Sequence, residues 1–395
     1  MTKFSGYIGT YTEGAAKSRG IYCFSMNVET GVIEDIRPAA EEKNPSYLAL
    51  SPSGEFLYAV NELDEYDGVP GGAVSAYRVR QDGSLRFLNR KSSGGPGPCH
   101  IAIHRNGTFA VTANYAAGSL AVLPIGKQGS LREAVQLIKY RGSGPRKKRQ
   151  ERAHAHSFTF APDFSGGFVC DLGADRLVLY RFDSKAKKPL IPLESIPALA
   201  GYGPRHGVFH PSGRFVYVLH ELRSTVDVFT VTDSEGDGKS KKSAPAFERL
   251  QTISTLPGKG NRKPSTAAAI RISGEAKFLY ASNRGYDSIA AFKILPDGLL
   301  ELVDVTDSGG EHPRDFIPDP GGNFLAVLNQ NSDNLVIFRI DHRTGLPKKE
   351  REYAVPSPAA IVFREAPAHT HAHAHIGGVD TAKHGAQAIP LPTRW

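Results

Sequence analysis

The sequence predicts an all-β fold, a seven-bladed β-propeller, and three observations support this prediction. A pair of apolar strands joined by a tight turn recurs seven times along the chain, with a period of about fifty residues that is typical of propellers. The 41 glycines and 27 prolines interrupt almost every stretch, which suits short strands and turns better than helices. Turn sequences of the Ser-Pro-Ser-Gly kind recur between strands, at 51–54, 210–213, 271–274 and 319–322.

One repeat gives the order of the elements within a blade. An inner strand at 44–51 is followed by a second strand at 56–62, a third at 73–79 and an outer strand at 84–90. Equivalent inner strands are expected to begin near Pro98, Ala155, Pro204, Ser265, Pro313 and Pro356. Second strands are expected at 6–12, 109–115, 167–173, 215–221, 278–284 and 324–330, and third strands at 20–26, 119–125, 176–182, 225–231, 288–294 and 334–340.

The last blade is predicted to be shared between the two ends of the chain. The chain starts on a second strand, 6–12, and its last repeat ends on an inner strand at 358–363. Pairing these two strands closes the circle and removes the exposed edges that an open β array must protect. We therefore expect one propeller domain over residues 1–365. Residues 366–395, which contain alternating histidines at 369–375, are expected to form a disordered tail.

Composition restricts the class of partner and the compartment. The net charge of +8 favours an anionic partner, but the aromatic residues interleaved with basic ones that a nucleic-acid platform needs are absent. The dense basic run at 145–152 is predicted to be a solvated loop between blades. No leader, membrane span or paired cysteine spacing is recognised, so we expect a cytoplasmic protein with no nucleic acid and no membrane as partner. It would be a monomer or a weak homo-oligomer.

The predicted topology places a candidate site at one end of the ring. In an up-and-down blade, the starts of the inner strands and the ends of the second strands meet at the same end of the central channel. The residues that open the inner strands are Ser46, Cys99, His156, Arg205, Thr266, Arg314 and Ser357. The second strands end in residues that include Glu221, Asn283, Arg284 and Gln330. We call this end of the channel the mouth.

His154 and His156 are expected on one face of a strand, because strand side chains alternate with a period of two. Two histidines on one face could bind a metal, but a catalytic zinc site usually has three protein ligands and no obvious third is seen. An imidazole titrates near neutral pH, which favours a histidine that acts on or contacts the substrate over one that is purely structural. We expect no metal and no cofactor.

Arg205 and Glu221 lie on paired strands of one blade and are predicted to sit side by side. His156 on one neighbouring blade and Arg284 on the other extend this pair to a cluster, and Gly285 allows a ligand to approach the backbone closely. Arg314 is a candidate anion clamp, although a salt bridge to Asp315 would serve equally well. The expected catalytic residues are His156, Arg205, Glu221 and Arg284, and the expected substrate contacts are His154, His206, Asn283, Arg314 and Gln330.

Several motifs resemble the lactonase family of seven-bladed β-propellers, which includes bacterial 6-phosphogluconolactonases and fungal carboxy-cis,cis-muconate lactonizing enzymes. The motifs are RQERAHAH (149–156), DLGADRLVLY (171–180), PRHGVFHPSGRFVYVLHEL (204–222), FLYASNRGYDSI (278–289) and the segment 310–334 with its HPRDF motif. The resemblance covers residues 4–363 and implies an enzyme without an obligatory metal. It assigns the site to His156 or His154, Arg205, Glu221 and Arg284. Many relatives carry an acidic residue where this chain has Ala269.

The resemblance and the predicted mouth together suggest hydrolysis of an anionic sugar lactone, with 6-phosphogluconolactone as the expected small-molecule substrate. Glu221 or His156 would remove the proton of the attacking water, while Arg205 and Arg284 would stabilise the oxyanion. Arg314, and also Lys147, Lys148 or Arg149, would steer a phosphate group into the mouth. One alternative keeps the fold but cycloisomerises a carboxylated muconate. The other is a non-enzymatic interaction platform, which predicts apolar or aromatic residues at the mouth where the sequence has His, Arg and Glu.

Overall fold

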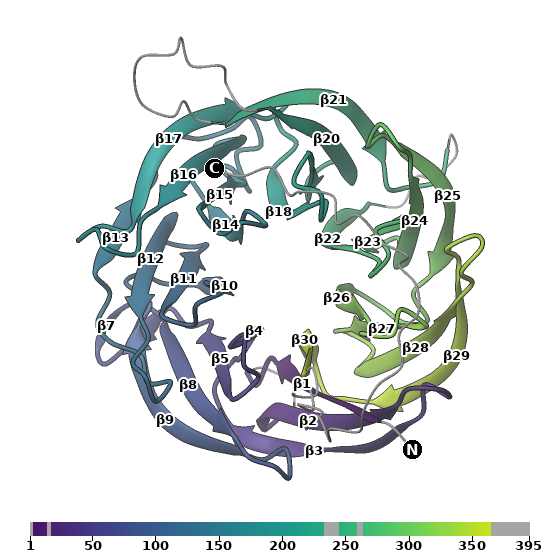
Figure 1. The fold of residues 1–395 in the computed structure, drawn as a ribbon, viewed down its shortest axis with the longest axis horizontal. Helices are drawn as coiled ribbons and strands as arrows, with labels where there is room; N and C mark the ends of the chain where they lie inside the picture. The colour runs from purple at the N-terminus through teal and green to yellow at the C-terminus, as the bar shows by residue number, and fades with distance from the viewer. Residues whose placement is uncertain (1–2, 14–16, 233–244, 259–263, 365–395) are drawn as a thin grey trace, which may run out of the picture.

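The computed structural model describes residues 3–13, 17–232, 245–258 and 264–364, and these residues form strands and no helix. The strands make seven four-stranded antiparallel sheets and one small hairpin. Figure 1 shows the seven sheets as blades of a closed ring, with one strand of each blade facing the centre. The predicted seven-bladed β-propeller is confirmed.

The strands fall into four classes by their position in a blade. The inner strands are β4 (Tyr47–Leu50), β10 (Pro98–Ile103), β14 (Ala155–Phe160), β18 (Pro204–Phe209), β22 (Thr266–Ile272), β26 (Pro313–Pro318) and β30 (Pro358–Arg364). The second strands are β1 (Lys3–Thr10), β5 (Phe56–Asn61), β11 (Phe109–Asn114), β15 (Gly166–Asp171), β19 (Phe215–His220), β23 (Phe278–Arg284) and β27 (Phe324–Asn329). The mouth lies where the inner strands begin and the second strands end.

The third and outer strands form the periphery. The third strands are β2 (Gly20–Asn27), β8 (Ala73–Val79), β12 (Ser119–Pro124), β16 (Arg176–Phe182), β20 (Thr225–Thr232), β24 (Ser288–Ile294) and β28 (Asn334–Ile340). The outer strands are β3 (Ile33–Glu41), β9 (Leu85–Ser92), β13 (Gln136–Lys139), β17 (Leu190–Pro197), β21 (Ala246–Ser254), β25 (Leu300–Asp307) and β29 (Pro347–Ala354). A hairpin of β6 (Glu65–Tyr66) and β7 (Val69–Pro70) lies in the connection between β5 and β8.

The two ends of the described chain share blade 1, as predicted. β1 pairs antiparallel with β30, so that Ile8 lies opposite Ile361, and the blade has the strand order β3-β2-β1-β30. The remaining blades follow in chain order as blades 2 to 7, from β4-β5-β8-β9 to β26-β27-β28-β29. Every inner strand then contacts the inner strands of both neighbouring blades, which closes the circle.

The core is divided into seven hydrophobic clusters, one at each junction between neighbouring blades. Ile8 and Phe24 of blade 1, for example, pack with Phe324 and Leu335 of blade 7. Complete burial of a side chain of this size stabilises the fold by about 1.5–3 kcal/mol. Because the clusters lie between blades, each blade is stabilised by its neighbours.

Four junctions are also bridged by a repeated tyrosine hydrogen bond. A tyrosine of one second strand donates its hydroxyl to a glycine carbonyl in the outer turn of the next blade: Tyr7 to Gly83, Tyr58 to Gly129, Tyr217 to Gly298 and Tyr280 to Gly345. Gly298 has a φ of +82°, and a Cβ there would lie 2.4 Å from the Phe215 ring. Only glycine fits this turn without strain.

A β-bulge at the start of the inner strands positions the mouth residues. In blade 3, Pro98 lies opposite Asn114 while His100 lies opposite Ala113, so that Cys99 between them has no partner. The same register shift leaves His156, Arg205 and Arg314 as the extra residues of blades 4, 5 and 7. A bulge redirects the side chain that it adds, which here repeats around the ring.

In the part of the chain that the structure describes, no helix exists that could cross a membrane. The predicted tail, residues 366–395, lies outside the described residues.

Candidate active site

Glu221 is the centre of the candidate site. It follows β19 directly, and its side chain is only 3% exposed. Its Oε2 atom lies 3.0 Å from Arg205 Nε, 3.1 Å from Arg284 Nη2 and 4.0 Å from His156 Nε2. Its Oε1 atom accepts a hydrogen bond from Arg149 Nη2. The four residues predicted as catalytic are therefore brought together, and a further arginine joins them.

The two buried arginines are held by backbone carbonyls as well as by Glu221. Arg205 Nη1 donates to the carbonyl of Ala268, and Arg284 Nη2 lies 3.3 Å from the carbonyl of Ala267. No hydrogen bond to a described residue uses Arg205 Nη2 or Arg284 Nη1. Each guanidinium group thus keeps an N–H donor for a ligand while its orientation is fixed.

Electrostatics assign different protonation behaviour to Glu221 and His156. Burial alone would raise the pKa of Glu221, but the charges of Arg284, Arg205 and Arg149 hold that pKa far below its usual range. Burial, reinforced by Arg205, lowers the pKa of His156 well below 6.5. At neutral pH the site therefore contains an ionised carboxylate of low basicity beside an uncharged imidazole.

Crowding also lowers the proton affinity of Arg284. Burial is the main cause, and the neighbouring guanidinium groups of Arg205 and Arg314 add to it, which brings the pKa of Arg284 down to about 10 despite the opposing effect of Glu221. The arginine still carries its charge at neutral pH. The mouth is therefore an environment in which positive charge is held close together and would be relieved by an anion.

His154 and His156 both pack against the Tyr115 ring, at centroid distances of 4.3 and 5.4 Å. His154 precedes β14, and the bulge at His156 breaks the alternation that was assumed. The His154 ring stacks on Tyr115 at 4.3 Å and donates through Nδ1 to the Tyr115 carbonyl. Only His156 lies within reach of Glu221, while His154 supports the wall of the mouth.

Arg314 belongs to a second polar cluster in the mouth. It contacts the Tyr11 hydroxyl and lies 3.6 Å from Glu62 Oε2, which also accepts hydrogen bonds from Tyr11 and, at 2.5 Å, from Ser46. The alternative pairing with Asp315 does not occur, because Asp315 bonds Arg271 at 2.8 Å. Arg314 is therefore balanced by Glu62 and placed to contact a ligand.

His206 lies beneath Arg205 rather than on the surface of the mouth. Its Nε2 accepts a hydrogen bond of 3.2 Å from Arg205 Nη1, and its ring packs edge-on against His156 and His100. Burial lowers the pKa of His206 well below its usual value, which keeps it uncharged beside the arginine. It therefore orients Arg205.

The last two predicted contacts differ from each other. Asn283 is completely buried, and its amide bonds Thr255, which follows the outer strand of blade 5, and Ser288 of its own blade, so its polar atoms are already used. Gln330 Oε1 is shielded and has no hydrogen-bond partner among the described residues. Gln330 thus retains an acceptor for a ligand hydroxyl, whereas Asn283 stabilises the turn that carries Arg284.

Sequence reasoning named Arg149 only as a basic residue that could steer a phosphate, and it did not place Tyr11 or His312 in the site. His312 has a φ of +63° at a position that blades 3 and 5 fill with Gly97 and Gly203, directly before the proline of the inner strand. Such strain is often retained at functional sites, and the Gly-Pro, Gly-Pro, His-Pro series was a signal in the sequence. No such signal indicated that Arg149 contacts Glu221, because strand periodicity does not predict where the side chain of a loop residue lies.

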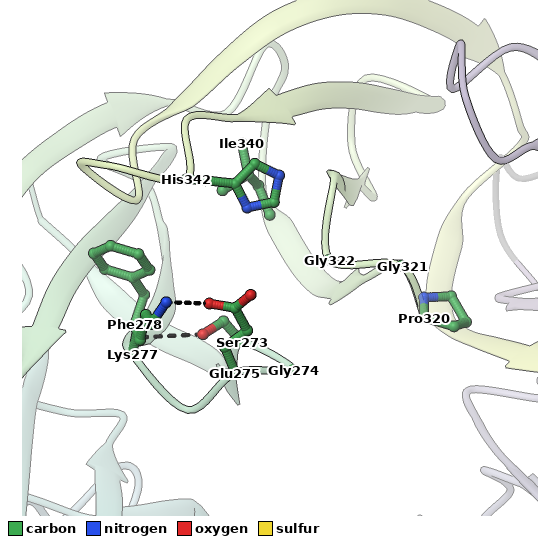
Figure 2. A pocket seen from close by; sticks show the side chains of 10 residues that line it. All are labelled: Ser273, Gly274, Glu275, Lys277, Phe278, Pro320, Gly321, Gly322, Ile340 and His342. Atoms are coloured by element: carbon green, nitrogen blue, oxygen red, sulfur yellow. Dashed lines mark hydrogen bonds and ion pairs between the residues drawn. The ribbon is translucent and has the colours of Figure 1, made fainter. Parts of the chain in front are cut away.

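Other possible sites are less convincing. A cavity of about 210 Å³ lies between the inner turns of blades 6 and 7, lined by Lys277, Phe278 and His342 among others (Figure 2). These turns are at the opposite end of the strands from the mouth. Among the described residues, no group of three or more His, Cys, Asp or Glu side chains is arranged to hold a metal ion.

Comparison with known proteins identifies close relatives over nearly the whole ring. Residues 5–363 match the family model "Lactonase, 7-bladed beta-propeller". The chain is 34% identical over 367 residues to a 6-phosphogluconolactonase of Bacillus subtilis, covering 92% of this chain and 99% of that protein. It is 33% identical to a 6-phosphogluconolactonase of Formosa agariphila over 362 residues, which cover 90% and 98% of the two chains. The solved periplasmic gluconolactonase of Pseudomonas aeruginosa is 32% identical with a TM-score of 0.83, covering 93% of this chain and all of that one.

Proposed function

The chain belongs to the lactonase family of seven-bladed β-propellers, and from this premise we propose that it hydrolyses 6-phosphogluconolactone to 6-phosphogluconate at the mouth of the ring. The observation that carries the proposal is the cluster around Glu221, in which Arg149, Arg205 and Arg284 contact one buried carboxylate beside an uncharged His156. Lactone hydrolysis needs a base, an oxyanion site and, for this substrate, a cationic surrounding. The mouth supplies all three.

In the proposed mechanism His156 takes a proton from water as the water oxygen bonds to the lactone carbonyl carbon. The negative charge that develops on the carbonyl oxygen is stabilised by the free N–H groups of Arg205 and Arg284. When the intermediate collapses, the bond from carbon to the ring oxygen breaks, and the imidazolium returns its proton to that oxygen. The products are the open-chain acid and the unchanged enzyme.

Between the two candidate bases we favour His156, because both carboxylate oxygens of Glu221 are already paired with arginine side chains. Glu221 is a weak base because the arginines that surround it stabilise its ionised form. Its carboxylate lies 4.0 Å from His156 Nε2 and would stabilise the imidazolium while it holds both arginines in place. Arg314 and Gln330 are proposed to contact substrate hydroxyls, and His154, His206 and Asn283 to support the site.

The alternatives are distinguished by reaction rather than by residues. Cycloisomerisation of a carboxylated muconate would use the same base and the same arginines, so it remains the second candidate reaction. An interaction platform with no chemistry is disfavoured by a mouth built from Arg, His and Glu side chains. We propose a cytoplasmic protein, monomeric or weakly self-associating, that binds no nucleic acid and no membrane, and we note that one relative is named periplasmic.

The test is hydrolysis of freshly generated 6-phosphogluconolactone, coupled to phosphogluconate dehydrogenase and compared with the uncatalysed rate. We expect saturable activity in the wild type and its loss in Glu221→Gln and in Arg205→Ala. Because removal of Glu221 also perturbs folding, His156→Asn serves as a second variant that leaves the ion pairs intact. Wild-type rates at background would refute the proposal and direct the search to muconate-type lactones.

A further inference from the structure

Arg149 is the component of the mouth that ester hydrolysis itself does not require. It lies on the 141–152 loop, and its side chain is 41% exposed, compared with 4% for Arg205 and 9% for Arg284. It reaches down from the rim and bonds Glu221 Oε1 and, at 3.4 Å, the Tyr115 hydroxyl. Its Nε and Nη1 atoms bond no described residue. Arg149 therefore presents free donors at the rim while it covers one oxygen of Glu221.

The loop backbone beneath Arg149 is firmly anchored. Gln150 is completely buried and donates to the Leu172 carbonyl at 2.9 Å. Arg146 donates to the Gly201 carbonyl at 2.8 Å, and the amide nitrogens of Arg149 and Gln150 both bond the Arg146 carbonyl. A change of partner by Arg149 would thus require a new side-chain rotamer and no movement of the loop.

The charges of the mouth are not balanced around Glu221. Three guanidinium groups contact this single carboxylate, which leaves two positive charges uncompensated by it. One of them is the charge that an oxyanion between Arg205 and Arg284 would neutralise. The other belongs to Arg149, which is directed to the entrance. Arg314, by comparison, is already balanced by Glu62 and its hydroxyl partners.

From this arrangement we infer that Arg149 recognises the phosphate of the substrate, and that it exchanges its bond to Glu221 for that phosphate on binding. This inference rests on the proposed function and names the residue that selects a phosphorylated lactone over a neutral one. The guanidinium group offers two parallel N–H donors to a phosphate, as Arg commonly does. The exchange replaces one anion by another, so the arginine stays paired throughout.

The exchange has a consequence for Glu221. Among the described residues only Arg149 bonds Oε1, whereas Oε2 holds Arg205, Arg284 and the contact to His156. Departure of Arg149 leaves Oε1 as a free acceptor beside the base. That oxygen can then accept a hydrogen bond from the attacking water and orient it. The phosphate would thus contribute to turnover as well as to binding.

The selectivity experiment compares 6-phosphogluconolactone with glucono-δ-lactone, which lacks the phosphate, by acid release in the same pH-indicator assay. In Arg149→Ala we expect the ratio of the two kcat/KM values to fall at least about tenfold, as for loss of a charge-assisted hydrogen bond. The neutral lactone should be hydrolysed faster than by the wild type, because Oε1 is uncovered. Arg149→Lys keeps the charge but loses the two parallel N–H donors, so its ratio should lie between those of the wild type and Arg149→Ala.

The matched control is Arg152→Ala. Arg152 lies on the same loop, is 66% exposed and pairs only with Glu151 at 3.4 Å among the described residues. Its removal should leave the selectivity ratio unchanged. An equal fall in this variant would overturn the inference, because the effect would then be general attraction of an anion by the basic loop.

A second readout begins with the wild type and needs no phosphorylated substrate. Inorganic phosphite dianion, added with the neutral lactone, should accelerate hydrolysis by the wild type and not by Arg149→Ala. Absence of acceleration together with an unchanged ratio in Arg149→Ala would overturn the inference while wild-type turnover of both lactones left the proposed function standing. Failure of the wild type to hydrolyse either lactone would instead refute the proposed function, and this inference with it.

Discussion

At the residue scale, the buried carboxylate of Glu221 organises the cations of the mouth. Arg205 and Arg284 are nearly inaccessible to water, and each would be a costly buried charge without this counterion. The surrounding arginines hold this carboxylate in a fixed position and also make it a weak base. The neighbouring imidazole of His156 is instead kept uncharged by burial, so that it can accept a proton.

The first prediction concerns the stability that Glu221 provides. Glu221→Gln leaves buried arginines unpaired and should lower the free energy of unfolding by about 3–5 kcal/mol at pH 7, measured by denaturant titration. Because the folded-state pKa of Glu221 is depressed, this contribution is present above the ordinary value of 4.5 and is lost as pH falls further. The difference between variant and wild type should therefore shrink in acid. Glu151→Gln removes an exposed carboxylate that pairs with Arg152 and His154, and it should change the free energy of unfolding by less than about 1 kcal/mol.

The second prediction concerns the pH dependence of turnover. The depressed pKa of His156 means that the base stays unprotonated well below pH 6.5. The acid limb of the kcat/KM profile should consequently lie below 6.5, with activity at pH 6 near its value at pH 7, after correction for the uncatalysed rate. An acid limb at or above 6.5 would show that His156 is not the base, or that its environment is more solvated than the structure indicates.

The sequence located the Arg205–Glu221 pair because both residues lie on one predicted hairpin, where strand pairing determines neighbours. It did not predict the bulge at His156, because alternation assumes a regular strand and this bulge lies where the strand begins. The contact of Arg149 with Glu221 could not be predicted in this way. Its position depends on how Gln150 and Arg146 anchor an irregular loop, and no periodic pattern encodes that.

At the element scale, the inner strands are short and bulged where they meet the mouth. The starts at Pro98, Pro204 and Pro313 were predicted correctly, because proline opens a strand without needing a ladder hydrogen bond. The start at Ala155 was also predicted correctly, from its place in the repeat. The bulges were not predicted, since the extra residue has no compositional mark. They occupy the same place in blade after blade, and the mouth inherits its ring of side chains from that repetition.

The third prediction concerns the outer turn of blade 6, in which the Gly298 carbonyl accepts the tyrosine hydrogen bond. Gly298→Ala should destabilise the protein by more than the approximately 1–2 kcal/mol that a left-handed conformation costs an L-residue, because its Cβ would also collide with the Phe215 ring. Gly322→Ala is the matched control, with a φ of +71° and open space around the new Cβ. Thermal or denaturant unfolding of both variants separates backbone strain from the collision. Equal losses would show that the Phe215 ring moves aside freely.

At the scale of the whole molecule, seven apolar junctions hold the ring, and each resembles the next. This equivalence is why the sequence period alone predicted the architecture. The mouth, by contrast, draws one or two residues from each of several blades. The side chains of the mouth come together only when the ring is closed.

The fourth prediction concerns the extent of the domain, which we propose to be residues 1–365. A chain ending at residue 365 should retain the kcat/KM of the full chain and unfold at the same denaturant concentration, because the family match ends at residue 363 and β30 at Arg364. A chain ending at residue 357 lacks β30 and should fail to fold into a functional ring. Loss of activity on removal of 366–395 alone would assign the tail a role in the enzyme.

The split blade has a consequence for biosynthesis. β1 leaves the ribosome before the other six blades, but its partner β30 is made only after them. Throughout that interval the inner edge of β1 is an open template for any other nascent strand. On a crowded polysome the correct partner for this edge is also present on the next chain along the message, so an exchanged dimer is the characteristic error to expect from slowed translation of the last repeat.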